Sequence, residues 1–194
     1  MLNDREPGTP ITGGRGCAPA VSHRAYIAIG TNLGDRLANY RKAVALIREL
    51  PSSRMTRESS LYESEPHGKA RNFFLNGVVE LITELEPKDL LKHLQKIEDS
   101  MGRKREPAGK KPTNVSRVID LDILLFDVET IDTKTLKVPH PELQNRRFVL
   151  LPLSELAPSL VHPVLSSTVS KLLVTTSDKK KCSLYKPLRG GNAA

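Results

Sequence analysis

The chain has 194 residues, enough for one domain with a substantial core, and 38% of them are hydrophobic. Only 4% are aromatic and none is Trp, which disfavours a large aromatic platform for stacking nucleic-acid bases. The formal charge is +8, but residues 1–24 and 179–194 hold eight basic and two acidic residues, which leaves +2 for the body. Most of the positive charge therefore lies near the ends, and the total by itself does not establish a nucleic-acid-binding function.

The sequence indicates a cytoplasmic protein without a membrane partner. No hydrophobic run is long enough to form a transmembrane helix, and residues 1–24 lack the apolar stretch of a signal peptide. The two cysteines, Cys17 and Cys182, both lie in predicted tails, so they are a poor candidate pair for a disulfide and fit a reducing compartment.

Two extensions are predicted to flank one folded domain. Residues 1–24 combine Gly, Pro and charge, and residues 179–194 begin with three lysines and end in a Gly-rich stretch. Such segments bury too little apolar surface to fold, so we expect both to be disordered. The domain is predicted to cover residues 25–178.

The first predicted elements are a strand and a helix. Residues 26–30 form a short apolar run that predicts a strand, and a turn-forming stretch then leads to Asp35. Asp is a preferred N-cap residue, so a helix is expected to begin directly after it. The apolar residues that repeat at helical spacing behind this cap are Leu37, Tyr40, Val44 and Ile47.

The remaining elements complete a β-α-β-β-α-β order. Strands are predicted over about 55–62 and over 74–85, followed by a helix that begins at Pro87, a favoured first-turn residue, and ends at Gly102. A last strand covers residues 118–126. This order predicts an α/β (α+β) fold with a ferredoxin-like core, in three layers, extended by a C-terminal part with helix and strand.

Two aspartates interrupt the apolar strand 118–126. Because side chains alternate along a strand, Asp120 and Asp122 project from the same face, with Cα atoms roughly 6.5 Å apart. Buried carboxylates require counter-charge, and oxygen ligands suit Mg²⁺, so the pair predicts a metal site. An edge strand with a wet face would explain the same alternation, and the spacing alone does not separate the two readings.

A basic segment stands immediately before this strand. Residues 103–117 contain six basic residues and one acidic residue. A basic loop beside an acidic metal site suggests a polyphosphate ligand, whose oxygens can be shared between cations and guanidinium groups. Standing alone, the segment would be read as a solvated loop.

Several common catalytic motifs are missing from the sequence. The turn from Gly30 to Gly34 lacks the Lys-Ser/Thr ending of a P-loop, and no dinucleotide-binding GxGxxG follows a predicted strand. The scattered histidines and peripheral cysteines support neither a hydrolase triad nor a zinc site.

Taken together, the motifs resemble those of the hydroxymethyldihydropterin pyrophosphokinase family over about residues 25–178. The resemblance is specific because the motifs follow one another in order across most of the chain. The segments that carry it are residues 25–35, 74–76, 95–98, 102–105, 117–124, 138–143, 145–150 and 155–158.

The resemblance implies an enzyme that transfers a pyrophosphoryl group from ATP to 6-hydroxymethyl-7,8-dihydropterin in folate biosynthesis, releasing AMP. It implies two Mg²⁺ ions as cofactors, ATP and the pterin as partners, no nucleic-acid partner and a monomeric state. Positioning and charge neutralisation are the main demands of such a transfer.

Carried over residue by residue, the resemblance implies the following sites. The metal ligands are Asp120 and Asp122. The catalytic group comprises these aspartates with Arg103, Arg105 and Arg117. The ATP-binding residues are Gln95, Glu98, Arg105, Ile123, His140 and Arg146. The pterin-binding residues are Asn32, Ser64 (through its backbone), Phe74, Asn76 and Phe148.

Two alternatives remain open. A ferredoxin-like nucleic-acid-binding module would use the basic loop and tails and would not need Asp120 and Asp122. A catalytically degenerate family member would bind ATP and pterin without turnover. Residues 114–116 keep this second alternative open, because they read Asn-Val-Ser where the family commonly has Pro before the arginine.

Overall fold

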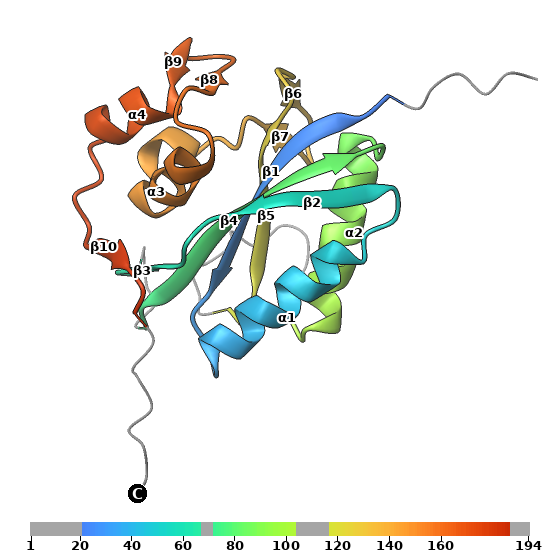
Figure 1. Cartoon of the computed structure of the whole chain (residues 1–194), viewed down its shortest axis with the longest axis horizontal. Helices are drawn as coiled ribbons and strands as arrows, with labels where there is room; N and C mark the ends of the chain where they lie inside the picture. The colour runs from blue at the N-terminus through green and yellow to red at the C-terminus, as the bar shows by residue number, and fades with distance from the viewer. Residues whose placement is uncertain (1–20, 67–71, 104–116, 187–194) are drawn as a thin grey trace, which may run out of the picture.

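The computed structural model describes residues 21–66, 72–103 and 117–186, which fold around a six-stranded antiparallel sheet (Figure 1). Its strands are β1 (His23–Thr31), β2 (Ser53–Glu58), β3 (Tyr62–Ser64), β4 (Phe74–Thr83), β5 (Asp120–Phe126) and β10 (Cys182–Leu184). The strand order is β10-β3-β4-β1-β5, and β2 also pairs with β4. The order β2-β4-β1-β5 is that of a ferredoxin-like core, which confirms the predicted fold class.

One predicted strand is divided in two by a corner. The stretch predicted over 55–62 forms β2 and β3, which pair with successive parts of the same edge of β4. The chain bends at Ser59, whose backbone N–H donates to the Val78 carbonyl while its hydroxyl accepts from the Val78 N–H. These long-range bonds hold a corner that residue pattern alone does not reveal.

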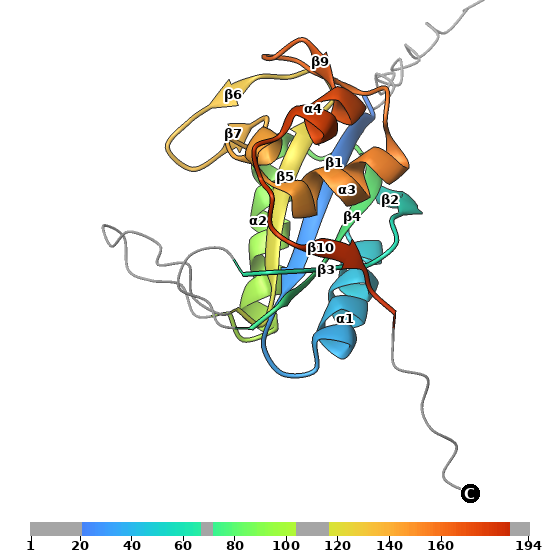
Figure 2. The ribbon, with the colours of Figure 1, turned by 90° about the vertical axis from the view of Figure 1, so that its left-hand side faces the viewer.

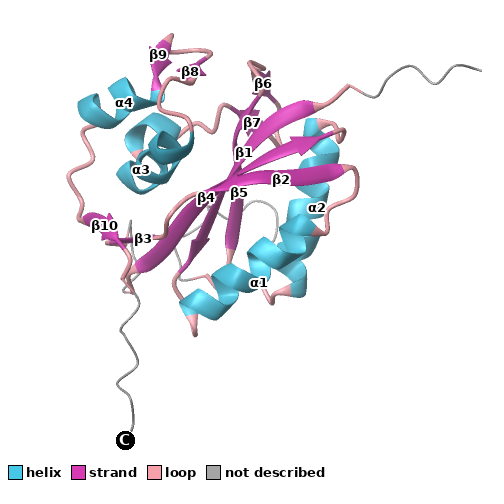
Figure 3. Ribbon diagram, in the orientation of Figure 1, coloured by secondary structure: helices cyan, strands magenta, loops and turns pink. Residues whose placement is uncertain are grey.

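Both predicted helices are present on one face of the sheet (Figure 3). Helix α1 (Arg36–Arg48) begins after Asp35, whose carboxylate accepts from the Ala38 N–H at 3.0 Å, as a capping residue should. Helix α2 (Pro87–Ser100) begins at Pro87 as predicted.

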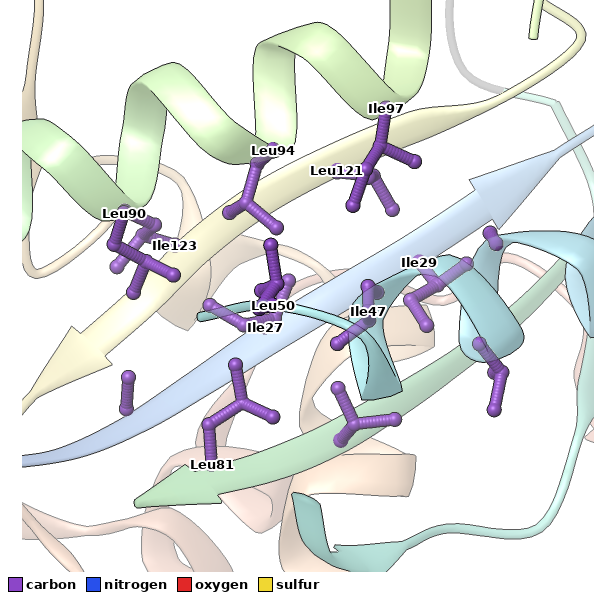
Figure 4. Packing of buried hydrophobic residues seen from close by; sticks show 14 of the residues in the cluster. Ile27, Ile29, Ile47, Leu50, Leu81, Leu90, Leu94, Ile97, Leu121 and Ile123 are labelled. Atoms are coloured by element: carbon purple, nitrogen blue, oxygen red, sulfur yellow. The ribbon is translucent and has the colours of Figure 1, made fainter. Parts of the chain in front are cut away.

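The core between this face and the two helices is aliphatic. Figure 4 shows Ile27, Ile29, Leu81, Leu121 and Ile123 from the sheet meeting Ile47, Leu50, Leu90, Leu94 and Ile97 from the helical layer. Because strand side chains alternate, burying Leu121 and Ile123 in this layer turns Asp120 and Asp122 to the other face of β5.

The second face of the sheet carries the C-terminal part of the chain. Helix α3 (Arg147–Leu156) packs on it with Leu150 and Leu153, and α4 (Val169–Thr175) packs beside α3. The described residues thus form the predicted three layers. The short elements here are β6 (Ile131–Asp132), β7 (Lys137–Val138), a 3₁₀ helix (Leu143–Asn145), β8 (Val161–His162) and β9 (Ser167–Thr168).

The prediction of a disordered tail from residue 179 is wrong for residues 179–186. This segment contains β10, which pairs with β3, and Tyr185 N–H donates to the Leu61 carbonyl at 2.8 Å. Composition suggested disorder because of the lysines, but the open edge of β3 supplies backbone partners. At the other end β1 already begins at His23, two residues before the predicted domain start. Residues 1–20 and 187–194 lie outside the described residues.

Among the described helices, none combines the length and the apolar character that crossing a membrane requires.

Candidate active site

A cavity of about 390 Å³ opens between the second face of the sheet and the N-terminal end of α3. Residues from β1, β4 and β5, the end of β3 and the segment 140–149 contribute to its walls. Nine of the fifteen predicted site residues line it, and these are Ser64, Phe74, Asn76, Arg117, Asp120, Asp122, His140, Arg146 and Phe148. Residues more than 80 positions apart in the chain are brought together here.

The carboxylate pair faces this cavity. The sheet order leaves β5 at an edge, as the alternative reading of the Asp pair assumed. The face that carries Asp120 and Asp122 nevertheless lines the cavity, and the side chains of Asp120 and Asp122 are 21% and 38% exposed. The arrangement therefore matches a site more closely than ordinary polar alternation.

Two arginines converge on Asp120. The Oδ1 atom lies 2.6 Å from Nη1 of Arg103, and Oδ2 lies 2.5 Å from Nη1 of Arg117. Arg103 is also paired with Glu98, whose Oε1 accepts the Leu121 N–H at 2.8 Å. Asp120 is thus the centre of a charged network that spans α2, β5 and the residues at both ends of the predicted basic segment.

Asp122 has a different environment from Asp120. Burial, and next the negative charge of Asp120, raise the pKa of Asp122 above its ordinary value. Both potential ligands are carboxylate oxygens, the donor type that Mg²⁺ prefers, and a cation would relieve the electrostatic cost that the raised pKa expresses. The residues present therefore fit a hard divalent cation.

His140 lies beside Asp122, with its Nε2 atom 3.9 Å from Oδ2. Burial, and next the charge of Arg146, lower the pKa of His140 to about 4, so the ring is neutral near pH 7. Its Nδ1 accepts the Glu142 N–H at 3.1 Å, so the neutral ring carries its proton on Nε2. His140 thus presents a donor toward the cavity, suitable for a phosphate oxygen.

The other end of the cavity is less charged and partly aromatic. Asn76 is buried, and its amide Nδ2 donates to Ser64 Oγ at 3.0 Å and to the Tyr62 carbonyl at 3.3 Å. Phe74 and Phe148 both line the same cavity. A fixed amide near two rings can bind a flat, polar heterocycle. The prediction gave Ser64 a backbone role, whereas here its hydroxyl orients Asn76.

The structure does not bring the ATP-side residues Gln95, Glu98 and Ile123 to the cavity wall. Ile123 is buried in the aliphatic core on the opposite face of β5 (Figure 4). Gln95 is half-buried on α2, and Glu98 is committed to Arg103 and the β5 backbone. Arg103 also stands behind the wall, in contact with Asp120.

Asn32 supports the site rather than lining it. Its Oδ1 accepts the Arg117 N–H at 2.6 Å, and its own N–H donates to the Arg117 carbonyl at 3.1 Å. It therefore fixes the backbone that presents the Arg117 guanidinium. Arg105 lies outside the described residues, together with residues 104–116 and the changed positions 114–116.

Three polar residues in the wall were not predicted, namely Glu65, Glu142 and Asn145. The last two stand inside a motif that carries the family resemblance, between His140 and Arg146, and that placement was the available signal. The direction in which the side chains of Glu142 and Asn145 point depends on the 3₁₀ turn Leu143–Asn145, which the sequence pattern did not indicate.

The fold is ferredoxin-like, and one cavity contains a carboxylate pair, arginines, a buried amide and two aromatic rings. These features define a class of protein that binds a metal-associated anion beside a flat heterocycle. A family model described as 7,8-dihydro-6-hydroxymethylpterin-pyrophosphokinase (HPPK) matches residues 26–158. The chain belongs to this family.

Curated relatives agree with this assignment, and solved structures share the fold. The chain is 46% identical to the 2-amino-4-hydroxy-6-hydroxymethyldihydropteridine pyrophosphokinase of Bacillus subtilis, over 70% of this chain and 79% of the relative. It is 43% identical to the Pseudomonas aeruginosa protein of the same name, over 72% and 84%. The fold is similar to wild-type Plasmodium falciparum HPPK-DHPS with SDX-DHP, with a TM-score of 0.63 at 17% identity. That match covers 79% of this chain but only 44% of the solved one.

Proposed function

We propose that the protein transfers a pyrophosphoryl group from ATP to 6-hydroxymethyl-7,8-dihydropterin, giving AMP and the pterin diphosphate in folate biosynthesis. The observation that carries this proposal is that one and the same cavity is lined by Asp120 and Asp122 and also by Asn76, Phe74 and Phe148. The names of the relatives above support the same reaction.

The charged end of the cavity receives the triphosphate. Asp120 and Asp122 would hold two Mg²⁺ ions, which would supply charge neutralisation at the phosphates. Arg117 and Arg146 add guanidinium donors, and His140 offers a neutral N–H. Gln95, Glu98 and Ile123 do not line the cavity, so we expect their contribution to ATP binding to be indirect, and we expect Arg103 to act through Asp120.

The amide end receives the pterin. Asn76, oriented by Ser64 Oγ, reads the polar edge of the ring, while Phe74 and Phe148 contact its faces. This places the hydroxymethyl group toward the carboxylate end, so that the alcohol attacks the β-phosphorus in line. Binding both ligands in one cavity holds the alcohol beside the phosphates, which favours the alcohol over water as the nucleophile.

We further propose that the protein acts as a cytoplasmic monomer without nucleic-acid or membrane partners. The near-neutral charge of the folded body and the low aromatic content support this, as does a cavity suited to small ligands.

Formation of AMP tests the function. Wild type should release AMP from Mg-ATP only when the pterin is present, and Asp120→Ala should abolish the release. Asp132→Ala removes an exposed aspartate that pairs with Lys137, and it should behave as wild type. Wild type that binds both ligands by calorimetry but yields no AMP would identify a degenerate member. Absence of pterin binding would contradict the proposal.

A further inference from the structure

The segment that follows α4 contacts both walls of the proposed pterin subsite. We call residues 178–185 the C-terminal strap. It lies beyond residues 26–158, which the family model matches, and it runs from the N-terminal end of α3 to β3 (Figure 2). The function proposed above assigns it no role.

The first attachment of the strap is a capping bond. Asp178 Oδ2 accepts the N–H of Arg147, the first residue of α3, at 2.9 Å, while Oδ1 accepts the Lys180 N–H at 3.1 Å. The N-cap residue of this helix, Arg146, makes no side-chain capping bond of its own. A carboxylate is the favoured group at a helix N-terminus. Asp178 therefore fixes the end of α3 that presents Arg146 and Phe148 to the cavity.

The second attachment is to β3 and the residues after it. Cys182 pairs with Ser64, and the Glu65 N–H donates to the Lys181 carbonyl at 3.0 Å. Lys180 Nζ donates to the Pro66 carbonyl at 2.7 Å. β3 is only three residues long, so the strap supplies its whole outer pairing. This is the wall in which Ser64 orients Asn76.

The far end of α3 is held independently. Glu155 accepts hydrogen bonds from the Ser60 N–H at 3.0 Å and from the Tyr62 hydroxyl at 3.2 Å. With that end attached to the corner before β3, loss of the Asp178 cap removes a constraint that acts on the N-terminal end of α3 alone. Phe148 lines the cavity from α3 and Phe74 lines it from β4, so a shift of the end of α3 would change the spacing between the two rings.

We infer that the C-terminal strap sets the spacing between α3 and β3 and thereby determines pterin affinity, with Asp178 as its positioning residue. This inference rests on the proposed function. The carboxylate end of the cavity is built on β5, which the strap does not bond among the described residues. Arg146 at the end of α3 also faces the phosphates, so ATP binding should weaken as well. The loss should be smaller than for the pterin, because Arg117, His140 and the two aspartates lie on segments that the strap does not bond within the part of the chain that the structure describes.

The test compares wild type with Asp178→Ala, Asp178→Asn, Lys180→Ala and Lys179→Ala in the full chain. Pterin affinity is measured by calorimetry with Mg²⁺ and an unreactive ATP analogue, and KM for each substrate is measured with kcat. Asp178→Ala should weaken pterin binding roughly five-fold or more, as expected for loss of a cap, with a clearly smaller rise in the KM for ATP. Asp178→Asn keeps an acceptor and should be intermediate.

Two variants serve as comparisons within the strap. Lys180→Ala removes only the bond to Pro66, so it should shift pterin affinity in the same direction by less. It also tests the inference if Asp178→Ala does not fold. Lys179 is exposed, and within the described part of the chain its side chain bonds the Thr176 carbonyl alone, so Lys179→Ala should match wild type.

Pterin affinity equal to wild type in Asp178→Ala and Lys180→Ala would overturn the strap inference while wild-type turnover still supported the proposed function. An equal loss of ATP and pterin binding would show a merely structural role and would also overturn it. Wild type that fails to bind the pterin would overturn both proposals.

Discussion

Asp120 and Asp122 occupy equivalent places on one strand face but differ in the partners that stabilise them. Asp120 is held by two guanidinium groups, and its removal leaves both arginines without this partner. Asp122 has a raised pKa, caused first by burial, so its charged form is disfavoured in the absence of a cation. The two residues should therefore contribute oppositely to stability although both are needed for activity.

We predict that Asp120→Asn lowers the free energy of unfolding by about 1–3 kcal/mol in EDTA, because Arg103 and Arg117 lose a charged acceptor. Asp122→Asn should leave stability unchanged or raise it, because a disfavoured charge is removed. Both should reduce pyrophosphoryl transfer by roughly a hundred-fold or more. Urea denaturation and AMP release measure these effects. Equal destabilisation by both variants would contradict the assigned environments.

The two cavity phenylalanines should matter for pterin affinity and not for ATP affinity. We predict that Phe148→Ala or Phe74→Ala weakens pterin binding by roughly ten-fold, because one face of the ring loses its aromatic contact. Phe73 is the matched control, since it is adjacent to Phe74 but 41% exposed and outside this cavity. Calorimetry measures the pterin affinity of each variant. An unchanged affinity in Phe148→Ala would show that the stacking assignment is wrong.

At the scale of elements, the closeness of α1 to β4 depends on one glycine. A Cβ at Gly77 would collide with the hydroxyl and ring of Tyr40, so β4 can approach the helix here only without a side chain. We predict that Gly77→Ala destabilises the fold by about 1–3 kcal/mol. Tyr40→Phe in the same chain removes the nearest atom and should restore part of the loss. Thermal unfolding of the single variants and of the double variant measures these effects. If the changes in stability caused by the two substitutions simply add in the double variant, the clash is excluded.

The pairing of β10 with β3 can be followed through Cys182. Burial raises the pKa of this thiol to about 11 from its ordinary value of 9.0. The unfolded thiol ionises first, so the folded state loses stability as the pH rises between these two values. In a Cys17→Ser variant, we expect alkylation at pH 8 to be roughly a hundred-fold slower in the folded protein than in urea. Equal rates would mean that β10 does not form.

At the scale of the whole molecule, ligand binding should stabilise the fold only when cation and nucleotide are present together. Asp120 and the two arginines compensate each other in the free protein, and we expect phosphate and cation to bind as a complex. An unreactive ATP analogue with Mg²⁺ at about 100 times its dissociation constant should add roughly 2.7 kcal/mol. Thermal unfolding with and without EDTA measures this, and full stabilisation in EDTA would contradict a metal-dependent site.

Local sequence patterns were sufficient for much of the architecture. Asp35 capped α1, Pro87 began α2, and the period-two alternation placed Asp120 and Asp122 on one face, as predicted. These features depend on residues within a few positions of one another. The same is true of the element order, which a few turn signals and apolar runs define.

Other features depended on contacts between distant residues. The corner at Ser59 is held by Val78, the order of residues 179–186 by the free edge of β3, and the position of Arg117 by Asn32. No residue near each of these positions signals its partner, so composition and periodicity predicted a continuous strand and a disordered tail.

The sequence by itself determined the ferredoxin-like element order, the shared face of the two aspartates and the membership of a pterin pyrophosphokinase family, because short-range geometry and motif order are written in neighbouring residues. Only the tertiary structure decided that Glu98 binds Arg103 behind the cavity, that Ile123 points into the core and that Asp178 caps α3. These outcomes are set by packing and by hydrogen bonds between residues that lie 5 and 31 positions apart in the chain. Such contacts form only once the layers of the fold have assembled.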